Sequence, residues 1–189
     1  IFDECKEYSK QVTKMDVTDT FVLNALVPVD FALWQLWARA NNACDFDKIY
    51  KGEDKNVKLA NIPLITYGVP VDQVQQMAKD GVCIVKIKIG SDPEGDGDQQ
   101  KMLAWDKARM LAIHNALKDT ETPYTECGKA VYYFDANGRY ESKELLKELV
   151  DYMVETGIAD QTVLFEEPFY PYADQSLRYV CNHRCGLHT

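Results

Sequence analysis

The sequence predicts an α/β fold in which strands and helices alternate along the chain. Short β-prone apolar runs end at glycine or at a polar turn, and segments with helical spacing lie between them. The composition, with 46% hydrophobic and 27% charged residues, is that of an ordinary globular protein. Such alternation favours parallel strands joined by right-handed crossovers, and both a doubly wound sheet and a (β/α)₈ barrel agree with it.

The first third of the chain contains a polar segment, an apolar segment and a charged segment. Residues 1–20 are weakly patterned and suit either a short strand or a frayed helix. Asp30–Ala38, with Pro28 near its first turn, predicts a buried helix. Residues 42–61 are rich in Asp, Lys and Asn, which indicates a boundary between a domain at 1–60 and a second domain at 61–189.

The regular rhythm begins after this boundary. Four β-prone runs predict strands at Ile62–Tyr67, Val82–Ile89, Ala130–Phe134 and Val163–Phe165. Helical spacing predicts helices at Val71–Lys79, at Met102–Leu117 and over residues 145–154, the last one ended by Gly157.

Charge and hydropathy disfavour several classes of partner. The 21 basic and 30 acidic side chains give a net charge of −9, whereas nucleic acids and anionic membranes require a basic face. No uninterrupted apolar run approaches the roughly 18 residues of a membrane helix, and the first ten residues show no signal-peptide pattern. We therefore expect a cytoplasmic protein with reduced cysteines that binds neither nucleic acid nor a membrane.

Two lysines share one face of the second predicted strand. Because side chains alternate along a strand, Lys86 and Lys88 lie opposite Val85, Ile87 and Ile89. On the inner face of a barrel, mutual repulsion and desolvation would lower the pKa of at least one lysine, as a general base requires. An edge strand with a solvated lysine face explains the pair equally well.

Carboxylates follow the third and fourth predicted strands. Asp135 and Asn137 share a face where the third strand ends, and of Glu166 and Glu167 only one can point inward. Asx turn chemistry and two exposed glutamates are the alternatives that need no site. Because the carboxyl ends of parallel barrel strands hold catalytic groups, these residues and the lysines together predict a site that could bind Mg²⁺.

These motifs resemble the enolase superfamily, in particular its mandelate racemase and muconate lactonizing branch. The matching segments are Lys86-Ile87-Lys88, Asp135-Ala136-Asn137 and Glu166-Glu167-Pro168, together with residues 29–34, within residues 22–171. The resemblance implies a TIM-type (β/α)₈ barrel preceded by an α+β capping domain. A barrel takes about 250 residues, so we expect only its first four β/α units here, preceded by the terminal helices of the capping domain.

The resemblance also implies roles for individual residues. Asp135 and Glu166 would be two of three Mg²⁺ ligands, and Lys88 would be the acid/base on one face of the substrate. Lys86 would tune the charge near Lys88 and the substrate carboxylate, while Asn137 and Glu167 would support the site from behind these groups. The third metal ligand and the opposite acid/base belong to later strands of the family, which we do not expect in this chain.

The implied function is Mg²⁺-dependent removal of the α-proton of a small carboxylate substrate to give an enediolate. The Lys-x-Lys pair favours a racemase or epimerase similar to dipeptide epimerases, with acid-sugar dehydration as the alternative. A non-catalytic half-barrel that self-associates through its open edges is a second interpretation. We expect a homo-oligomer whether the chain is an enzyme or such a half-barrel. A third interpretation is a doubly wound fold in which these motifs occur by chance.

The tail lacks the β/α rhythm. Residues 176–189 read as a truncated chain or as a shifted reading frame near Gln175. The spacing of the cysteines and histidines between Cys181 and His188 fits no common zinc finger.

Overall fold

The computed structural model describes residues 1–17, 19–43, 59–169 and 179–181, and the chain divides into two compact units, Ile1–Val57 and Lys58–Thr189. Most of the expected boundary at 42–61 lies outside the described residues, as do Gln175, His183, Cys185 and His188. Cys5, Cys83 and Cys127 are free thiols.

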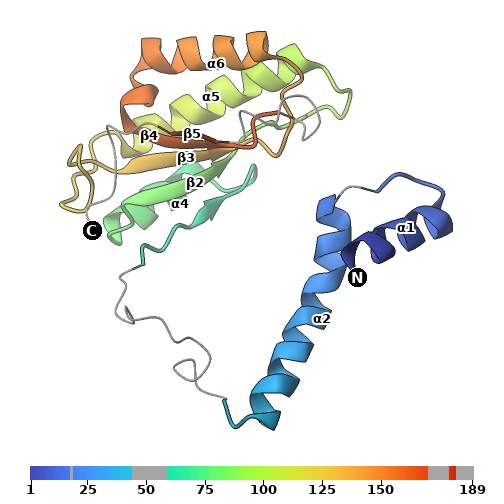
Figure 1. Ribbon diagram of the computed structural model, residues 1–189. Coiled ribbons are helices and arrows are strands. Elements are labelled where there is room, and N and C mark those ends of the chain that lie inside the picture. Colours follow the sequence, from blue (N-terminus) through green and yellow to red (C-terminus); the bar gives the residue numbers. More distant parts are fainter. Residues whose placement is uncertain (18, 44–58, 170–178, 182–189) are drawn as a thin grey trace. The chain divides into compact units, whose positions relative to one another are not determined.

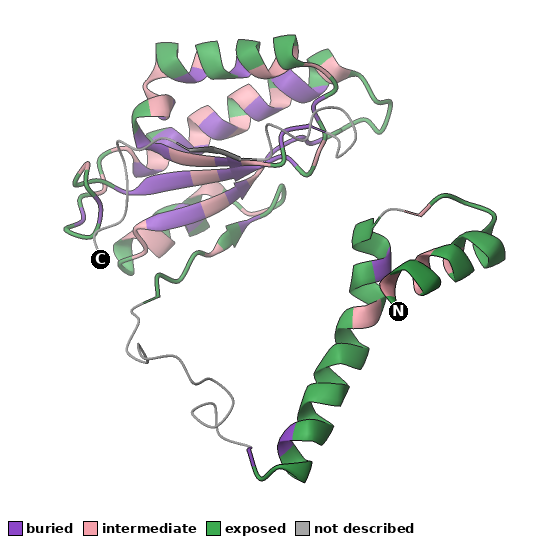
Figure 2. Cartoon of the chain, viewed as in Figure 1, coloured by how far each residue is buried: buried purple, intermediate pink, exposed green. Residues whose placement is uncertain are grey.

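The first unit consists of helices α1 (Phe2–Thr13) and α2 (Asp19–Ala40), which pack against each other and are joined by an ion pair of 2.6 Å between Lys6 and Asp19. The expected helix is present within α2, but its expected burial is wrong. Most of α2 is exposed (Figure 2), and Phe31, for example, is 63% exposed. The groove between the two helices is lined on α2 by residues 21–26 only. Within this unit, α1 therefore covers only the beginning of α2.

Helix α2 is more apolar than the absence of a long uninterrupted apolar run in the sequence suggested. Among the described residues it is the one helix long and apolar enough to cross a membrane, with a mean hydropathy of 1.4 over 18 residues. Asp30 and Gln35 interrupt the apolar residues of α2, so this helix contains no long unbroken apolar run. The core helices of soluble proteins and signal sequences share this length and composition, so the feature does not assign α2 to a membrane.

The second unit is built on one mostly parallel sheet. Strands β1 (Leu64–Ile65), β2 (Ile84–Lys88), β3 (Val131–Asp135) and β4 (Thr162–Glu166) are parallel and adjacent in chain order (Figure 1). The short strand β5 (Tyr179–Cys181) adds to β4 in the antiparallel direction. The strand order never reverses among these five, whereas a doubly wound sheet reverses its order at a switch point.

Three helices connect the parallel strands: α4 (Val71–Lys79), α5 (Gln99–Leu117) and α6 (Lys143–Thr156), the last followed by the 3₁₀ helix η1 (Ile158–Gln161). Helix α4 packs beside α5. Helix α5 packs beside α6 (Figure 1). The Asp98 carboxylate accepts hydrogen bonds from the first amides of α5, and the Ser142 hydroxyl does the same for α6. Gly157, with a φ of 79°, ends α6 as expected.

All three helices cover the same face of the sheet. Val74 of α4, Met110 of α5 and Leu149 of α6 belong to one core with the alternate strand residues of that face, namely Val85, Ile87, Tyr132, Phe134 and Phe165. The four parallel strands and their one-sided helices confirm the predicted α/β class. Closure into a barrel and the capping domain stay predictions, because the described strands form an open sheet.

Candidate active site

The predicted site residues meet on the face of the sheet that the helices leave uncovered. Lys88 of β2 pairs in register with Asp135 of β3, which pairs with Glu166 of β4. One step earlier, Lys86 pairs with Tyr133. The parity deduced from the sequence therefore places both lysines and both carboxylates on one face, at the carboxyl ends of three adjacent parallel strands.

These four charged side chains form one connected ion network. The Lys86 ammonium lies 2.7 Å from Asp135 Oδ2 and 2.5 Å from Glu166 Oε2, and the Lys88 ammonium lies 2.5 Å from the same Asp135 oxygen. The Asp135 side chain is only 2% exposed, whereas the other three are about one-fifth exposed. Asp135 is thus the buried centre of the network, and both lysines reach the solvent-facing side.

Asn137 joins the network through the turn that ends β3. Its side-chain oxygen accepts a hydrogen bond from the Lys88 ammonium, and its backbone amide donates to Asp135 Oδ1 over 3.0 Å. Its φ of 46° lies in the left-handed region, which asparagine tolerates better than most residues. The Asp-Ala-Asn-Gly sequence therefore forms a turn and also orients the central carboxylate.

Glu167 stands apart from the other predicted residues. Its side chain is exposed, and its backbone has a φ of 40°. Its carbonyl oxygen accepts a hydrogen bond of 2.7 Å from the amide of Gly138. Glu167 therefore links the loops after β3 and β4 through its backbone.

Tyr133 is a site residue that sequence reasoning missed. Its hydroxyl donates to the Glu166 carboxylate and lies 3.3 Å from the Lys86 ammonium, which also sits 4.7 Å from the centre of its ring. The sequence did contain a signal for it, because Tyr133 and Asp135 are two residues apart on one strand and so share a face. A tyrosine between apolar neighbours reads more naturally as part of the core.

The network shifts the pKa values of its members. Burial alone would lower the pKa of Lys86, but hydrogen bonds to Asp135, Glu166 and Tyr133 outweigh it and the pKa is raised. Burial likewise opposes ionisation of Asp135, yet the two ammonium groups hold its pKa below the usual range. Burial and the bond to Glu166 raise the pKa of Tyr133 to about 12. The lowered pKa expected for at least one of the lysines is therefore not found at Lys86, where these hydrogen bonds outweigh burial.

The donor set suits a hard divalent cation in part. Mg²⁺ is held in many proteins by one or two carboxylates together with retained waters, and Asp135 and Glu166 offer two. The Lys86 ammonium contacts both carboxylates, so a metal ion shared by them would require this side chain to move. Across the described ranges, no three His, Cys, Asp or Glu side chains are grouped so that they could hold a metal ion.

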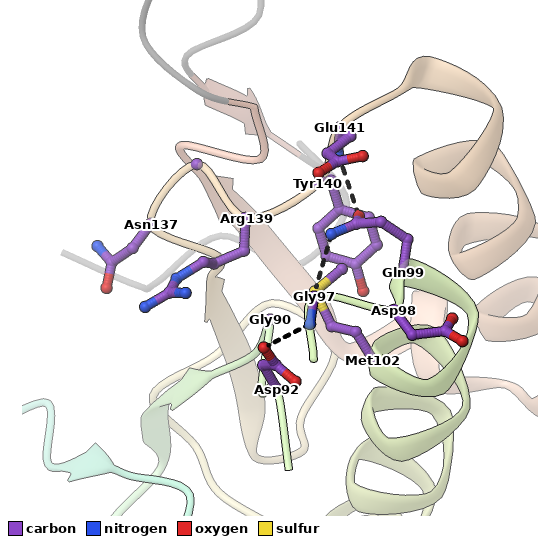
Figure 3. A pocket seen from close by; sticks show the side chains of 11 residues that line it. Gly90, Asp92, Gly97, Asp98, Gln99, Met102, Asn137, Arg139, Tyr140 and Glu141 are labelled. Carbon is purple, nitrogen blue, oxygen red and sulfur yellow. Dashed lines mark hydrogen bonds between the residues drawn. The ribbon is translucent and has the colours of Figure 1, made fainter. Parts of the chain in front are cut away.

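A cavity of about 510 Å³ adjoins the network (Figure 3). Its walls are the loop after β2, the start of α5 and the loop after β3, and Asn137 belongs to both the cavity lining and the network. Asp92 accepts hydrogen bonds from the amides of Gly95 and Gly97, and Gln99 accepts one from the amide of Glu141. The loops around the site are therefore cross-linked.

Comparisons with known proteins do not assign a family. No family model matches the chain, and no curated protein gives a significant match. Among solved structures, one match is the O-succinylbenzoate synthase from Thermosynechococcus elongatus BP-1, complexed with Mg in its active site, at 19% identity and a TM-score of 0.42. The match covers 65% of this chain and 32% of that chain, about a third of its length. The roles of the site residues therefore rest on the geometry described above.

Proposed function

We propose that the network of Lys86, Lys88, Asp135 and Glu166 is an active site of the enolase-superfamily type, which removes the α-proton of a small carboxylate substrate. The observation that carries the proposal is the convergence of these four charges at the carboxyl ends of three adjacent parallel strands. Buried ion pairs contribute little to stability once desolvation is counted, so folding alone is a weak reason for such a network.

Lys88 is the acid/base in this proposal. Its Nζ lies at the solvent-facing end of the network, where Asp135 and Asn137 fix its position. To act as a base, Lys88 must first give its extra proton to solvent, after which its lone pair can take the α-proton. Lys86 lies between Asp135 and Glu166 in this structure, and in the proposal it stays protonated and provides positive charge for the substrate carboxylate.

Asp135 and Glu166 would hold Mg²⁺, with Lys86 displaced from between them. When bound, the metal would supply positive charge where the substrate carboxylate gains negative charge as the α-proton leaves. The two carboxylates would provide oxygen ligands for it at the ends of β3 and β4.

We favour racemisation or epimerisation, as in dipeptide epimerases, over acid-sugar dehydration. Both reactions begin with the same proton transfer to Lys88. They differ in the next event: epimerisation returns a proton, from solvent or a second acid, to the opposite face of the α-carbon, whereas dehydration expels the protonated hydroxyl group of the neighbouring carbon as water. The products therefore separate the two reactions even though the first step is shared.

The proposal is tested by incubating the chain with dipeptides and acid sugars in D₂O, with Mg²⁺ or with a chelator. We expect Mg²⁺-dependent deuterium incorporation at the α-carbon, detected by NMR, without loss of water from the substrate. Calorimetric titration with Mg²⁺ alone should show binding that Asp135→Asn weakens about tenfold. Asp151→Asn, which alters an exposed lysine-paired carboxylate on α6, is the control. Absence of both incorporation and Mg²⁺ binding would refute the proposal.

Self-association is a second candidate, favoured by the exposed apolar surface of α2. Several of its large side chains are more than half exposed, including Phe31, Leu33 and Leu36. Sedimentation velocity on the wild-type chain and on the double variant Phe31→Ser/Leu36→Ser distinguishes association through α2 from a monomeric state. A dimer that dissociates in the variant supports association through α2, and a concentration-independent monomer excludes it.

A further inference from the structure

Asp106 is a buried carboxylate that the proposed chemistry does not use. It lies on α5, is 0% exposed and accepts three hydrogen bonds. The donors are the amide of Gly90 at 2.7 Å, the amide of Ser91 at 3.4 Å and the hydroxyl of Tyr140 at 2.6 Å. We call Asp106, Gly90, Ser91 and Tyr140 the Asp106 bracket.

The bracket ties together the two loops that carry the site. Gly90 and Ser91 follow Lys88 by two and three residues, and Tyr140 follows Asn137 by three. The loops also touch directly: a Cβ on Gly90, whose φ is 81°, would lie 2.5 Å from the side chain of Arg139. Asp106 therefore holds the end of β2 and the end of β3 to one point on α5, directly beyond the Lys88–Asp135 contact.

The other end of α5 makes a similar connection without a buried charge. There the ring of His114 lies 3.2 Å from the hydroxyl of Tyr132, so a tyrosine again bonds to a side chain of α5. Tyr132 and Tyr140 are both 1% exposed. A neutral partner is thus sufficient to join helix and sheet, and the carboxylate is found only at the end that carries the site.

Ionised Asp106 is costly to the fold. Burial raises its pKa to about 6, although the bonds from Tyr140, Gly90 and Ser91 act in the opposite direction. At neutral pH the folded protein therefore holds a charge in a dry environment. A role in organising the two loops accounts for a group that stability alone would not favour.

We propose that Asp106 is a positioning residue, whose carboxylate holds the loops after β2 and β3 so that Lys88 stays in contact with Asp135 and Asn137. This inference rests on the function proposed above for Lys88 and deepens it. Asp106 itself touches neither lysine of the network. It acts through the backbone of Gly90 and Ser91 on one side and through Tyr140 on the other.

The first test needs no substrate and uses amide hydrogen exchange of the whole chain. In Asp106→Asn and Tyr140→Phe, we expect exchange of the Gly90 and Ser91 amides to rise about tenfold. The Asn137 amide, which reports on the Asp135 carboxylate, should follow them. Tyr132→Phe removes an equally buried tyrosine hydroxyl that contacts the same helix through His114, and it should leave all three amides unchanged. An unaltered Asn137 amide in Asp106→Asn overturns the inference.

The second test measures deuterium incorporation into substrate by the same three variants. We expect the rate at saturating substrate to fall about tenfold in Asp106→Asn and Tyr140→Phe with little change in KM, and Tyr132→Phe to match the wild type. Equal losses in all three variants would mean that the bracket only stabilises the fold, which also overturns the inference. A wild-type chain with neither incorporation nor Mg²⁺ binding would refute the proposed function, and the exchange experiment would still decide the role of Asp106.

Discussion

The two faces of the sheet differ in what covers them. On one face Val85, Ile87 and Phe134 are almost fully buried beneath α4, α5 and α6. On the other face the adjacent strands present Lys86, Lys88 and Glu166, each about one-fifth exposed, around the buried Asp135. The covered face supplies the burial that stabilises the fold, whereas the other face holds charges whose desolvation works against stability.

This difference teaches where substitutions should act. A change on the covered face should alter the free energy of unfolding and leave the ion network in place. A change in the network should alter metal binding and proton transfer at a smaller cost in stability. The predictions below test this separation in order of decreasing effect on stability.

The largest effect should come from Phe134→Ala. Phe134 packs between Tyr132 and Phe165, with ring centres 6.2 and 5.3 Å away. Loss of this buried ring should lower the free energy of unfolding by about 3–5 kcal/mol, measured by urea denaturation. Tyr133→Phe, the neighbouring position on the opposite face, should cost about 1 kcal/mol. Equal losses at the two positions would contradict the separation.

The pH dependence of stability should identify Asp106. Its pKa is raised to about 6, so the folded protein keeps this proton over a range in which the unfolded chain releases it. The stability contributed by this group should therefore be greatest below about pH 4 and fall by roughly 3 kcal/mol as pH rises through about 6. Its titratable neighbours Tyr67 and Tyr140 both have raised pKa values and stay neutral there. Denaturation of Asp106→Asn should lack this decrease, and identical profiles would contradict the assignment.

Asp135 should make stability depend on pH in the direction opposite to Asp106, and at lower pH. Its folded pKa is lowered, so its contribution to stability is present above the ordinary aspartate pKa of about 4 and is lost as pH falls through the folded value. The two aspartates thus have separate windows. Asp135→Asn should remove the loss of stability at the acid end without altering the change between pH 4 and 6.

Removal of Lys86 should link stability to metal binding. Lys86→Met leaves Asp135 and Glu166 without the ammonium that lies between them, at a cost of roughly 2 kcal/mol. Mg²⁺ should then raise the melting temperature of the variant more than that of the wild type, because the position between the carboxylates is vacated. Lys107→Met, which removes a similarly exposed lysine paired with Glu148, should show no such gain. An equal Mg²⁺ effect in all three proteins would place the metal elsewhere.

The smallest effects should come from the helix caps. Asp98→Ala and Ser142→Ala each remove a side chain that accepts hydrogen bonds from the first turn of α5 or α6. Each should cost about 1 kcal/mol in thermal or urea unfolding and leave Mg²⁺ affinity unchanged. A change in metal affinity of either variant would show that the helix starts are coupled to the network.

Local patterns predicted much of the second unit. The apolar spacing of Val71–Lys79 matches α4, and strict alternation in β2 places Lys86 and Lys88 on the face opposite Val85 and Ile87. Alternation is local, so it fixes which face a residue occupies. The gathering of Lys88, Asp135 and Glu166 followed from parallel pairing, because equivalent strand ends then meet at one edge.

The features that sequence reasoning missed depend on distant contacts. Asp106 reads as an ordinary polar position on a helix until the loops after β2 and β3 are seen to donate to it. The sequence around Tyr133 suggests a core residue, and only the contact with Glu166 shows that it belongs to the site. The exposure of α2 depends on which segments pack against it, and the antiparallel direction of β5 depends on pairing across the sheet. Helix α5 begins at Gln99 rather than at Met102, because Asp98 caps it.

The most direct test of the central claim is the rate of Mg²⁺-dependent α-deuterium incorporation by the wild type, Lys88→Met and Lys107→Met. Lys88 and Lys107 are about equally exposed and each is paired with one or more carboxylates, but only Lys88 belongs to the network at the strand ends. We expect Lys88→Met to abolish incorporation and Lys107→Met to retain the wild-type rate. Incorporation that persists without Lys88 would show that this network does not carry out the proton transfer.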